Sequence, residues 1–375
     1  MRKKEIVRER PFEYMRRRSN GQYYEAGIVK NWYIARAYVL DRFKDVAIGP
    51  DSPDSLHVVL DGDSPLMLAL VRQLCLSAHF TNYVEYDFMD RLSCKHRTRI
   101  SLVSGMPAAQ ISGELEKEEY LGLLPTCIKL SIYGRVSNPD SYLDVEIEVV
   151  GERPVMGPSS VRITEEEVLR FVQETPEEDI FTIDTRRAVL AGRVYELGAV
   201  IDNIPAEDIH SARRYIHALD IYRYKVAEEK IGPLVHPDNW EKNPTAVVNG
   251  VSSLCCSDCF ASRAQGMRQY SLQHGIPEQE AWAMHNEALS LSEHNRWMVE
   301  RLVMGIRQFD ATERLTYETL FGRSRMTYWK RLKNNHKDPA HVDLCSYRDL
   351  RRIDPNNLKY DSFLLLAIPI ILEKT

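Results

Sequence analysis

The sequence lacks a long apolar run, a disulfide framework and a strong excess of either charge. Its longest apolar run, Phe363 to Leu372, contains Pro369 and is shorter than the roughly 18 apolar residues that span a bilayer. The first residues form no apolar signal segment, and the seven cysteines are an odd number spread along the chain. Both features favour a cytoplasmic protein in a reducing compartment over a secreted protein held by disulfides.

The overall charge is close to balanced. The chain has 49 Lys and Arg against 54 Asp and Glu, a net charge of −5 at pH 7, which is too little positive charge for a protein that coats duplex nucleic acid. A basic binding site must therefore be local. The first twenty residues contain one local excess, with eight Lys and Arg against three Glu. This segment would suit an anionic membrane surface or a membrane-protein partner, and a solvated arm is the alternative.

The pattern along the chain predicts more than one domain. Its 375 residues exceed the roughly 100–200 residues of a single domain. Strand-like runs at 56–60, 99–104, 142–150 and 179–183 alternate with helix-like stretches at 66–76, 114–124, 165–172 and 186–200. This alternation predicts an α/β layer with a mainly parallel sheet. The alternating apolar residues of 142–150 place that strand near an edge of the sheet.

From about Asp208 onward the pattern is helical, with breaks around 232–250 and at 275–277. We therefore predict a basic arm and helix at 1–54, a Rossmann-like α/β domain at 55–205, a helical connector at 206–284 and an α-helical domain at 285–375. The predicted fold class is thus α/β plus all-α.

The first candidate site is the strand, turn and helix at 56–76. Ser64 fits an N-cap, and Pro65 fits the first helical position. A dinucleotide-binding turn needs several glycines, because the pyrophosphate approaches the backbone at the helix N-terminus. This turn has only Gly62, and Asp63 adds a negative charge. It resembles a degenerate copy of the first unit of the TrkA-N nucleotide-binding domain of potassium-uptake regulators, which implies either an NAD(H) site at Gly62 or a structural, dimerising layer.

A cysteine cluster is the second candidate. Cys255, Cys256 and Cys259 contain one C-x-x-C pair, the spacing with which two thiolates reach one zinc ion. A zinc site needs further ligands, and downstream only His274 and His285 could contribute, at no recognised spacing. We therefore expect buried helical cysteines in place of a metal site. The sequence also shows no recognisable set of nucleophile, base and orienting acid, so it predicts no catalytic residue, no cofactor and no enzyme.

The third candidate is the stretch 291–305, LSEHNRWMVERLVMG. On one helix His294, Trp297 and Arg301 lie at i, i+3 and i+7, hence on one face. Such a face can stack a base and hold a phosphate, since an indole and a guanidinium are flat and Arg forks onto phosphate oxygens. In the structural alternative, Trp297 packs in the core, His294 bonds a buried carbonyl and Arg301 pairs with a neighbouring acid such as Glu300.

The stretch 321–337 contains no acidic residue and mixes basic with aromatic side chains. Its basic residues are Arg323, Arg325, Lys330, Arg331, Lys333 and Lys337, and its rings include Tyr328, Trp329 and His336. A run this basic is often a solvated face. Interleaved rings and cations also fit a compact anionic ligand that carries a ring.

Four spaced elements of the C-terminal quarter together resemble the ryanodine-receptor repeat (RyR) domain. They are LSEHNRWMVERLVMG at 291–305, Lys333 with His336, DLCSYRDL at 343–350, and Lys359-Tyr360-Asp361. The chain departs from the family pattern at Ile306, where the family has Trp, and at Ser346, where it has Pro. Bacterial chains that join a TrkA-N-like layer to an RyR domain have a similar order of segments and are viewed as sensors in nucleotide-signalling, antiviral-defence or ion-channel systems.

The resemblance implies a non-enzymatic sensor that binds a nucleotide or a cyclic nucleotide. It implies that Trp297 and Tyr347 stack the base and that His294 hydrogen-bonds it. The residues that would bind phosphate are Arg301, Lys333, His336 and Lys359. A homodimer is expected by analogy alone. Two other hypotheses stay open, namely an NAD(H)-binding regulator or dehydrogenase that uses the turn at 56–76, and a protein-interaction scaffold.

Overall fold

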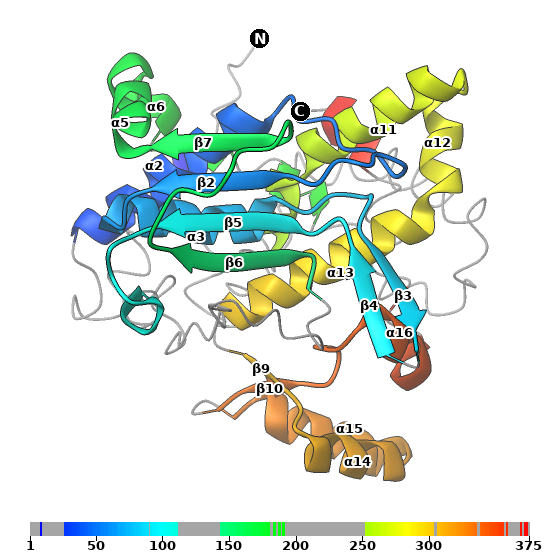
Figure 1. Ribbon diagram of the computed structural model, residues 1–375. Coiled ribbons are helices and arrows are strands. Elements are labelled where there is room, and N and C mark those ends of the chain that lie inside the picture. The colour runs from blue at the N-terminus through cyan, green and yellow to red at the C-terminus, as the bar shows by residue number, and fades with distance from the viewer. Residues whose placement is uncertain are drawn as a thin grey trace.

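A four-stranded parallel sheet forms the centre of the N-terminal half in the computed structural model (Figure 1). Its strands are β2 (His57–Asp61), β5 (Thr98–Val103), β6 (Val145–Val150) and β7 (Ser160–Thr164), in the order β6-β5-β2-β7. All neighbouring strands are parallel. In chain order this is third, second, first and fourth, the order found in a Rossmann sheet, whose winding reverses beside its first strand. The predicted parallel α/β layer is confirmed, and β6 lies at the predicted edge.

The structure describes residues 8–9, 26–89, 91–111, 143–180, 183–184, 187–188, 190–191, 252–303, 306–335, 338–355, 358, 368–369 and 371–373. The helix predicted at 114–124, most of the helix predicted at 186–200 and most of the predicted connector lie outside the described residues. The boundaries of the four predicted segments stay a prediction.

The register of the strands gives the sheet one apolar face. This face rests on α3 (Pro65–Ser77), which begins after the N-cap Ser64 as predicted, and α3 packs on α2 (Ala26–Phe43). The fully buried strand residues of this face are Val58, Leu60, Ile100, Leu102 and Ile163. Because these side chains alternate along each strand, their neighbours point to the opposite face.

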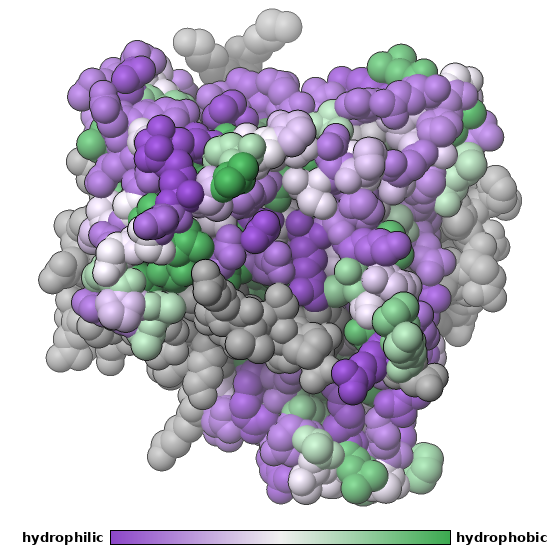
Figure 2. Space-filling model, in the orientation of Figure 1, coloured by the Kyte–Doolittle hydropathy of each residue, from purple (hydrophilic) through white to green (hydrophobic). Residues whose placement is uncertain are grey.

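The opposite face is polar, and a chain of hydrogen bonds crosses it. Ser101 donates to Glu148 at 2.5 Å, and His57 Nε2 lies 2.7 Å from the Ser101 oxygen. Because the Glu148 carboxylate can only accept, Ser101 must accept from His57 Nε2. The other ring nitrogen, Nδ1, is then left to accept from Ser160 at 3.3 Å. Figure 2 is viewed from this face and shows hydrophilic side chains over the strands.

An antiparallel hairpin that the sequence did not predict is inserted between α3 and β5. Its strands are β3 (Val84–Phe88) and β4 (Arg91–Lys95). The Glu85 carboxylate accepts from the backbone N–H groups of Tyr347 and Arg348, both at 3.3 Å. These two residues begin helix α16 (Tyr347–Ile353), so the hairpin positions that helix. Val84, Tyr86 and Phe88 alternate with Glu85 and Asp87 in the first strand, a local strand signal that the sequence analysis missed. Both strands are only five residues long and have no buried residue.

The C-terminal part is mainly helical. Its further helices are α11 (Phe260–His274), α12 (Glu278–Met284), α13 (Asn286–Val303), α14 (Ala311–Thr319) and α15 (Gly322–Lys333). The predicted break at 275–277 is present, because Gly275 ends α11 in the left-handed conformation at φ 65°. Two short strands, β9 (Arg307–Gln308) and β10 (Ala340–His341), pair in parallel, so this part is not purely helical.

The strand predicted at 179–183 is wrong over its first residues. Residues 179 and 180 lie in the helical turn α6 (Glu177–Ile180), where their N–H groups bond to the Pro176 carbonyl. A proline followed by acidic residues favours a first helical turn. Among the described residues of this stretch, extended backbone appears at β8 (Ile183–Asp184), which pairs with β1 (Arg8–Glu9). The helix predicted at 165–172 is α5 (Glu165–Glu174), which follows the unpredicted strand β7 directly.

The sheet layer and the C-terminal helices share one core. Helix α13 packs against α3, and its residues Met298, Val299 and Val303 belong to the same apolar cluster as the sheet residues. Helix α11 approaches the loop before β2 so closely that a Cβ on Gly266 would lie 2.6 Å from the carbonyl oxygen of Ile48. Only glycine fits there, because backbone faces backbone and no side chain can move aside.

We expect Gly266→Ala to destabilise the protein by about 1–3 kcal/mol, the cost typical of overpacking. Alanine would gain about 1 kcal/mol in helix propensity, so a net loss shows that the close approach to Ile48 dominates. The free energy of unfolding from urea titration measures this. The matched control is Gly151→Ala, whose added Cβ meets no atom within 4 Å. Equal stability of the two variants would contradict the contact.

Candidate functional site

The predicted face of α13 is formed as the spacing indicated. His294, Trp297 and Arg301 lie along one side of the helix, with the His294 and Trp297 rings stacked at 6.1 Å between centroids. The Arg301 guanidinium lies 5.4 Å from the centroid of the Trp297 ring. Trp297 is half-buried, whereas Arg301 is only 9% exposed. The indole thus contacts a cation on one side and an imidazole on another.

The imidazole of His294 is buried and hydrogen-bonded within the protein. It is 2% exposed, and its Nε2 donates to the Cys345 carbonyl at 2.8 Å. Burial lowers the pKa of His294 to about 4, so the ring is neutral near pH 7. This geometry is the one that the structural alternative expects for His294.

Tyr347 reaches the same place from α16. Its ring lies 5.7 Å from the His294 ring and 4.9 Å from the Arg351 guanidinium, and the residue is 7% exposed. Because Trp297 keeps more accessible surface than Tyr347, it is the better platform for a stacked base. The Arg301 Nε lies 3.6 Å from a Glu300 oxygen, which matches the acid pairing of the structural alternative.

His341 joins these residues to helix α15. Its ring makes edge contacts with Trp297 at 5.1 Å and with Trp329 at 5.6 Å. The Lys333 ammonium lies 4.7 Å from the centroid of the Trp329 ring. Burial, followed by the positive charges of Lys333 and Arg301, lowers the pKa of His341 well below its ordinary value.

We call this group the aromatic-basic cluster; its members are His294, Trp297, Arg301, Trp329, Lys333, His341 and Tyr347. Five of the seven predicted ligand-binding residues are among them. The other two, His336 and Lys359, lie outside the described residues. The sequence analysis missed His341 because its place depends on the pairing of β10 with β9, which joins residues far apart in the chain.

The lysine of the cluster is the member most open to solvent. Lys333 is exposed, but its position beside Trp329 desolvates the ammonium, and the nearby Arg301 charge repels it. Desolvation and this repulsion lower the pKa of Lys333, while Asp343 acts in the opposite direction. Asp343 also lies 3.7 Å from His341 Nδ1. The cluster therefore holds two cations, with Asp343 as an acid that acts on both Lys333 and His341.

Two carboxylates, those of Asp61 and Asp63, flank Gly62 in the turn at 56–76. Gly62 has φ 122°, a conformation that favours glycine. Beside it, Asp61 pairs with Arg153 at 2.6 Å and with Arg162. Asp63 accepts from Ser104. The Asp63 carboxylate at the helix N-terminus opposes a phosphate there, whereas Asp61 is already neutralised by its two arginines. NAD(H) binding at Gly62 stays a prediction.

The cysteine cluster lies in the core. Cys256 and Cys259 have no exposed surface and Cys255 has 7%, and burial raises the pKa of all three thiols. Among the described residues, no group of three or more His, Cys, Asp or Glu side chains could hold a metal ion.

Within the part of the chain that the structure describes, no helix is long and apolar enough to cross a membrane.

We expect the protein to lose stability between pH 7 and pH 5. The ordinary pKa of histidine, 6.5, applies to the unfolded chain, whereas the pKa of folded His294 is about 4. In this window unfolding takes up a proton, so stability falls as pH falls, by about 2 kcal/mol for this residue. Urea titrations at both pH values measure the loss.

His294→Gln should remove that share of the pH dependence, because the amide can donate to the Cys345 carbonyl without titrating. Other buried histidines remain in the variant, so only the difference between the two proteins is assigned to His294. An unchanged pH dependence would show that His294 is solvated.

Comparisons with protein-family models, curated proteins and solved structures found no match to this chain.

Proposed function

We propose that the chain is a ligand-sensing protein whose aromatic-basic cluster binds a nucleotide or a cyclic nucleotide. The observation that carries this proposal is the placement of Arg301 and Lys333 around one buried, neutral histidine, His341. The two like charges repel each other, although Asp343 attracts Lys333 and Glu300 lies beside Arg301. A phosphate between them would replace that repulsion with two charge-assisted hydrogen bonds.

The base would lie on Trp297. An indole offers a large stacking surface that accepts any base, and Trp297 is half-buried at the edge of the cluster. In this arrangement His294 does not contact the ligand. Its bond to the Cys345 carbonyl fixes the imidazole, and its ring contacts hold Trp297 and Tyr347 in place. These roles agree with the resemblance to the RyR domain, except that His294 orients rings and does not contact the base.

Such a site can act as a switch because its cations come from different elements. Arg301 lies on α13, which shares the sheet core, whereas Lys333 is in the last turn of α15. A ligand that needs both cations binds better to the arrangement in which α15 lies close to α13. Binding therefore shifts the population toward that arrangement, and the difference in affinity sets the size of the shift.

Nucleotide binding is tested by thermal shift and calorimetry with AMP, ATP, cyclic nucleotides and NAD(H). Ligand at about 100 times its dissociation constant adds roughly 2.7 kcal/mol to stability. Lys333→Gln should weaken binding by about tenfold or more, since hydrogen bonds to charged groups contribute about 1.5–3 kcal/mol. Lys330→Gln, on the same basic helix and also exposed, is the matched control. Equal affinity of both variants would contradict the site.

Trp297→Ala separates the base from the phosphate. Loss of one stacked base costs about 1–3 kcal/mol, so nucleotide affinity should fall about 5- to 150-fold. Pyrophosphate affinity should stay within about twofold, because Arg301 and Lys333 remain. Binding of NAD(H) that Trp297→Ala leaves intact would point to the turn at Gly62, and no binding by any compound would favour a protein-interaction scaffold.

A further inference from the structure

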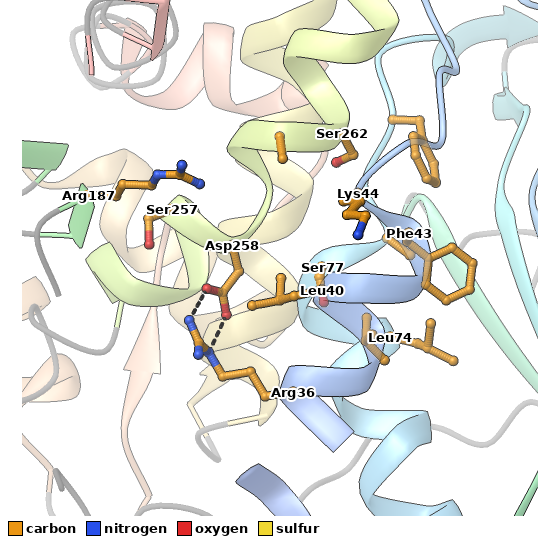
Figure 3. Close-up of a pocket in the computed structure, with 14 residues that line it drawn as sticks. Arg36, Leu40, Phe43, Lys44, Leu74, Ser77, Arg187, Ser257, Asp258 and Ser262 are labelled. Carbon is orange, nitrogen blue, oxygen red and sulfur yellow. Dashed lines mark hydrogen bonds and ion pairs between the residues drawn. The ribbon is translucent and has the colours of Figure 1, made fainter. Parts of the chain in front are cut away.

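An open cavity of about 370 Å³ lies between α2, the end of α3 and the helical residues around 257–262 (Figure 3). It shares no lining residue with the aromatic-basic cluster. Its volume falls within the roughly 300–1,000 Å³ of small-molecule sites. Leu40, Phe43 and Leu74 supply an apolar wall, so the cavity can hold an apolar or aromatic group.

The acidic residue that lines the cavity is already neutralised. Arg36 binds both oxygens of Asp258, with Nε at 2.9 Å from one and Nη2 at 2.5 Å from the other. The two side chains are 11% and 5% exposed, so the pair is largely shielded from water. A bidentate pair of this kind satisfies the carboxylate. Asp258 therefore does not repel an anion as an unpaired carboxylate would.

Two further cations border the cavity. Lys44 extends from the end of α2, and Arg187 lies on the other side of the cavity in Figure 3, with its guanidinium directed inward. Lys44 also contacts Asp41 at 2.8 Å, but both side chains are more than half exposed, and such pairs contribute little. The described residues of the lining thus include three basic side chains and one acidic side chain.

The serines of the lining cannot donate to an anion. Ser77, Ser257 and Ser262 each donate their hydroxyl proton to a backbone carbonyl three or four residues earlier. Each hydroxyl has one proton, so only its lone pairs remain. Among the described lining residues, the side chains that could hold an anionic group are therefore Lys44 and Arg187.

We propose that this cavity binds a small molecule with an apolar or aromatic body and one anionic head group. The body lies against Leu40, Phe43 and Leu74, and the head group lies between Lys44 and Arg187. The occupant would contact α2, α3 and the helical residues around 257–262, which include the start of α11; these three segments are far apart in the sequence. This site is separate from the nucleotide site, so either proposal can fail alone.

The test uses the full chain and the fluorescent probe anilinonaphthalene sulfonate, an aromatic anion. Octanoate and octanol compete for the probe; they share a chain length and differ in charge. We expect octanoate to displace the probe at about tenfold lower concentration than octanol. Lys44→Gln and Arg187→Gln should each remove most of this preference. Arg42→Gln, on α2 but not in the lining, should keep it.

Ala261→Phe tests the cavity itself, because its side chain lines the wall and the larger ring would fill the space. We expect this variant to lose at least half of the probe fluorescence. Lys44 is exposed, so Lys44→Gln should fold even if the Phe variant does not. Equal potency of octanoate and octanol, or the same loss of preference in Arg42→Gln as in Lys44→Gln, would overturn the proposal.

Discussion

Four charged side chains in the interior, Arg263, Glu293, Arg296 and Glu300, set the arrangement of the C-terminal helices. Glu293 accepts from Arg263 at 2.6 Å and from Arg296 at 2.9 Å, and Arg296 donates to Glu300 at 2.6 Å. All four residues are at most 1% exposed. Burial alone would raise the pKa of Glu293, but the charges of Arg296 and Arg263 outweigh it and hold the pKa at about 2. A buried charge without its partner would cost several kcal/mol, so α11, which carries Arg263, has little freedom to turn or slide against α13.

This constraint determines which way the rest of α13 faces. With the charged side turned toward α11, Met298, Val299 and Val303 enter the core shared with the sheet, and Trp297 remains at the edge beside His341. The hairpin β3–β4 adds a second support, because Glu85 binds the start of α16 and so holds Tyr347 near His294. The aromatic-basic cluster thus rests on contacts from both halves of the chain.

Each of the two proposed ligand sites includes residues of one helix of the packed pair α11 and α13. One combines α13, α15 and α16; the other combines α2, α3 and the helical residues around 257–262, which include the start of α11. Helices α11 and α13 are linked by the buried charges, and α11 lies close to the loop at Ile48 because Gly266 has no side chain. A ligand at either site would stabilise the packed arrangement of α11 and α13, and the gain in stability would rise with the affinity and the concentration of the ligand.

Local patterns in the sequence determined much of this architecture. The cap at Ser64, the break at Gly275, the edge strand at 142–150 and the shared face of His294, Trp297 and Arg301 all follow from spacing within one element, where neighbours along the chain are neighbours in space. Tertiary structure alone decided the contact of the hairpin β3–β4 with α16, the pairing of β7 with β2, the place of His341 and the cavity beside Asp258. Each of these depends on segments separated by long stretches of chain, and even an alternating strand such as Val84–Phe88 carries no local record of the distant segment that it packs against.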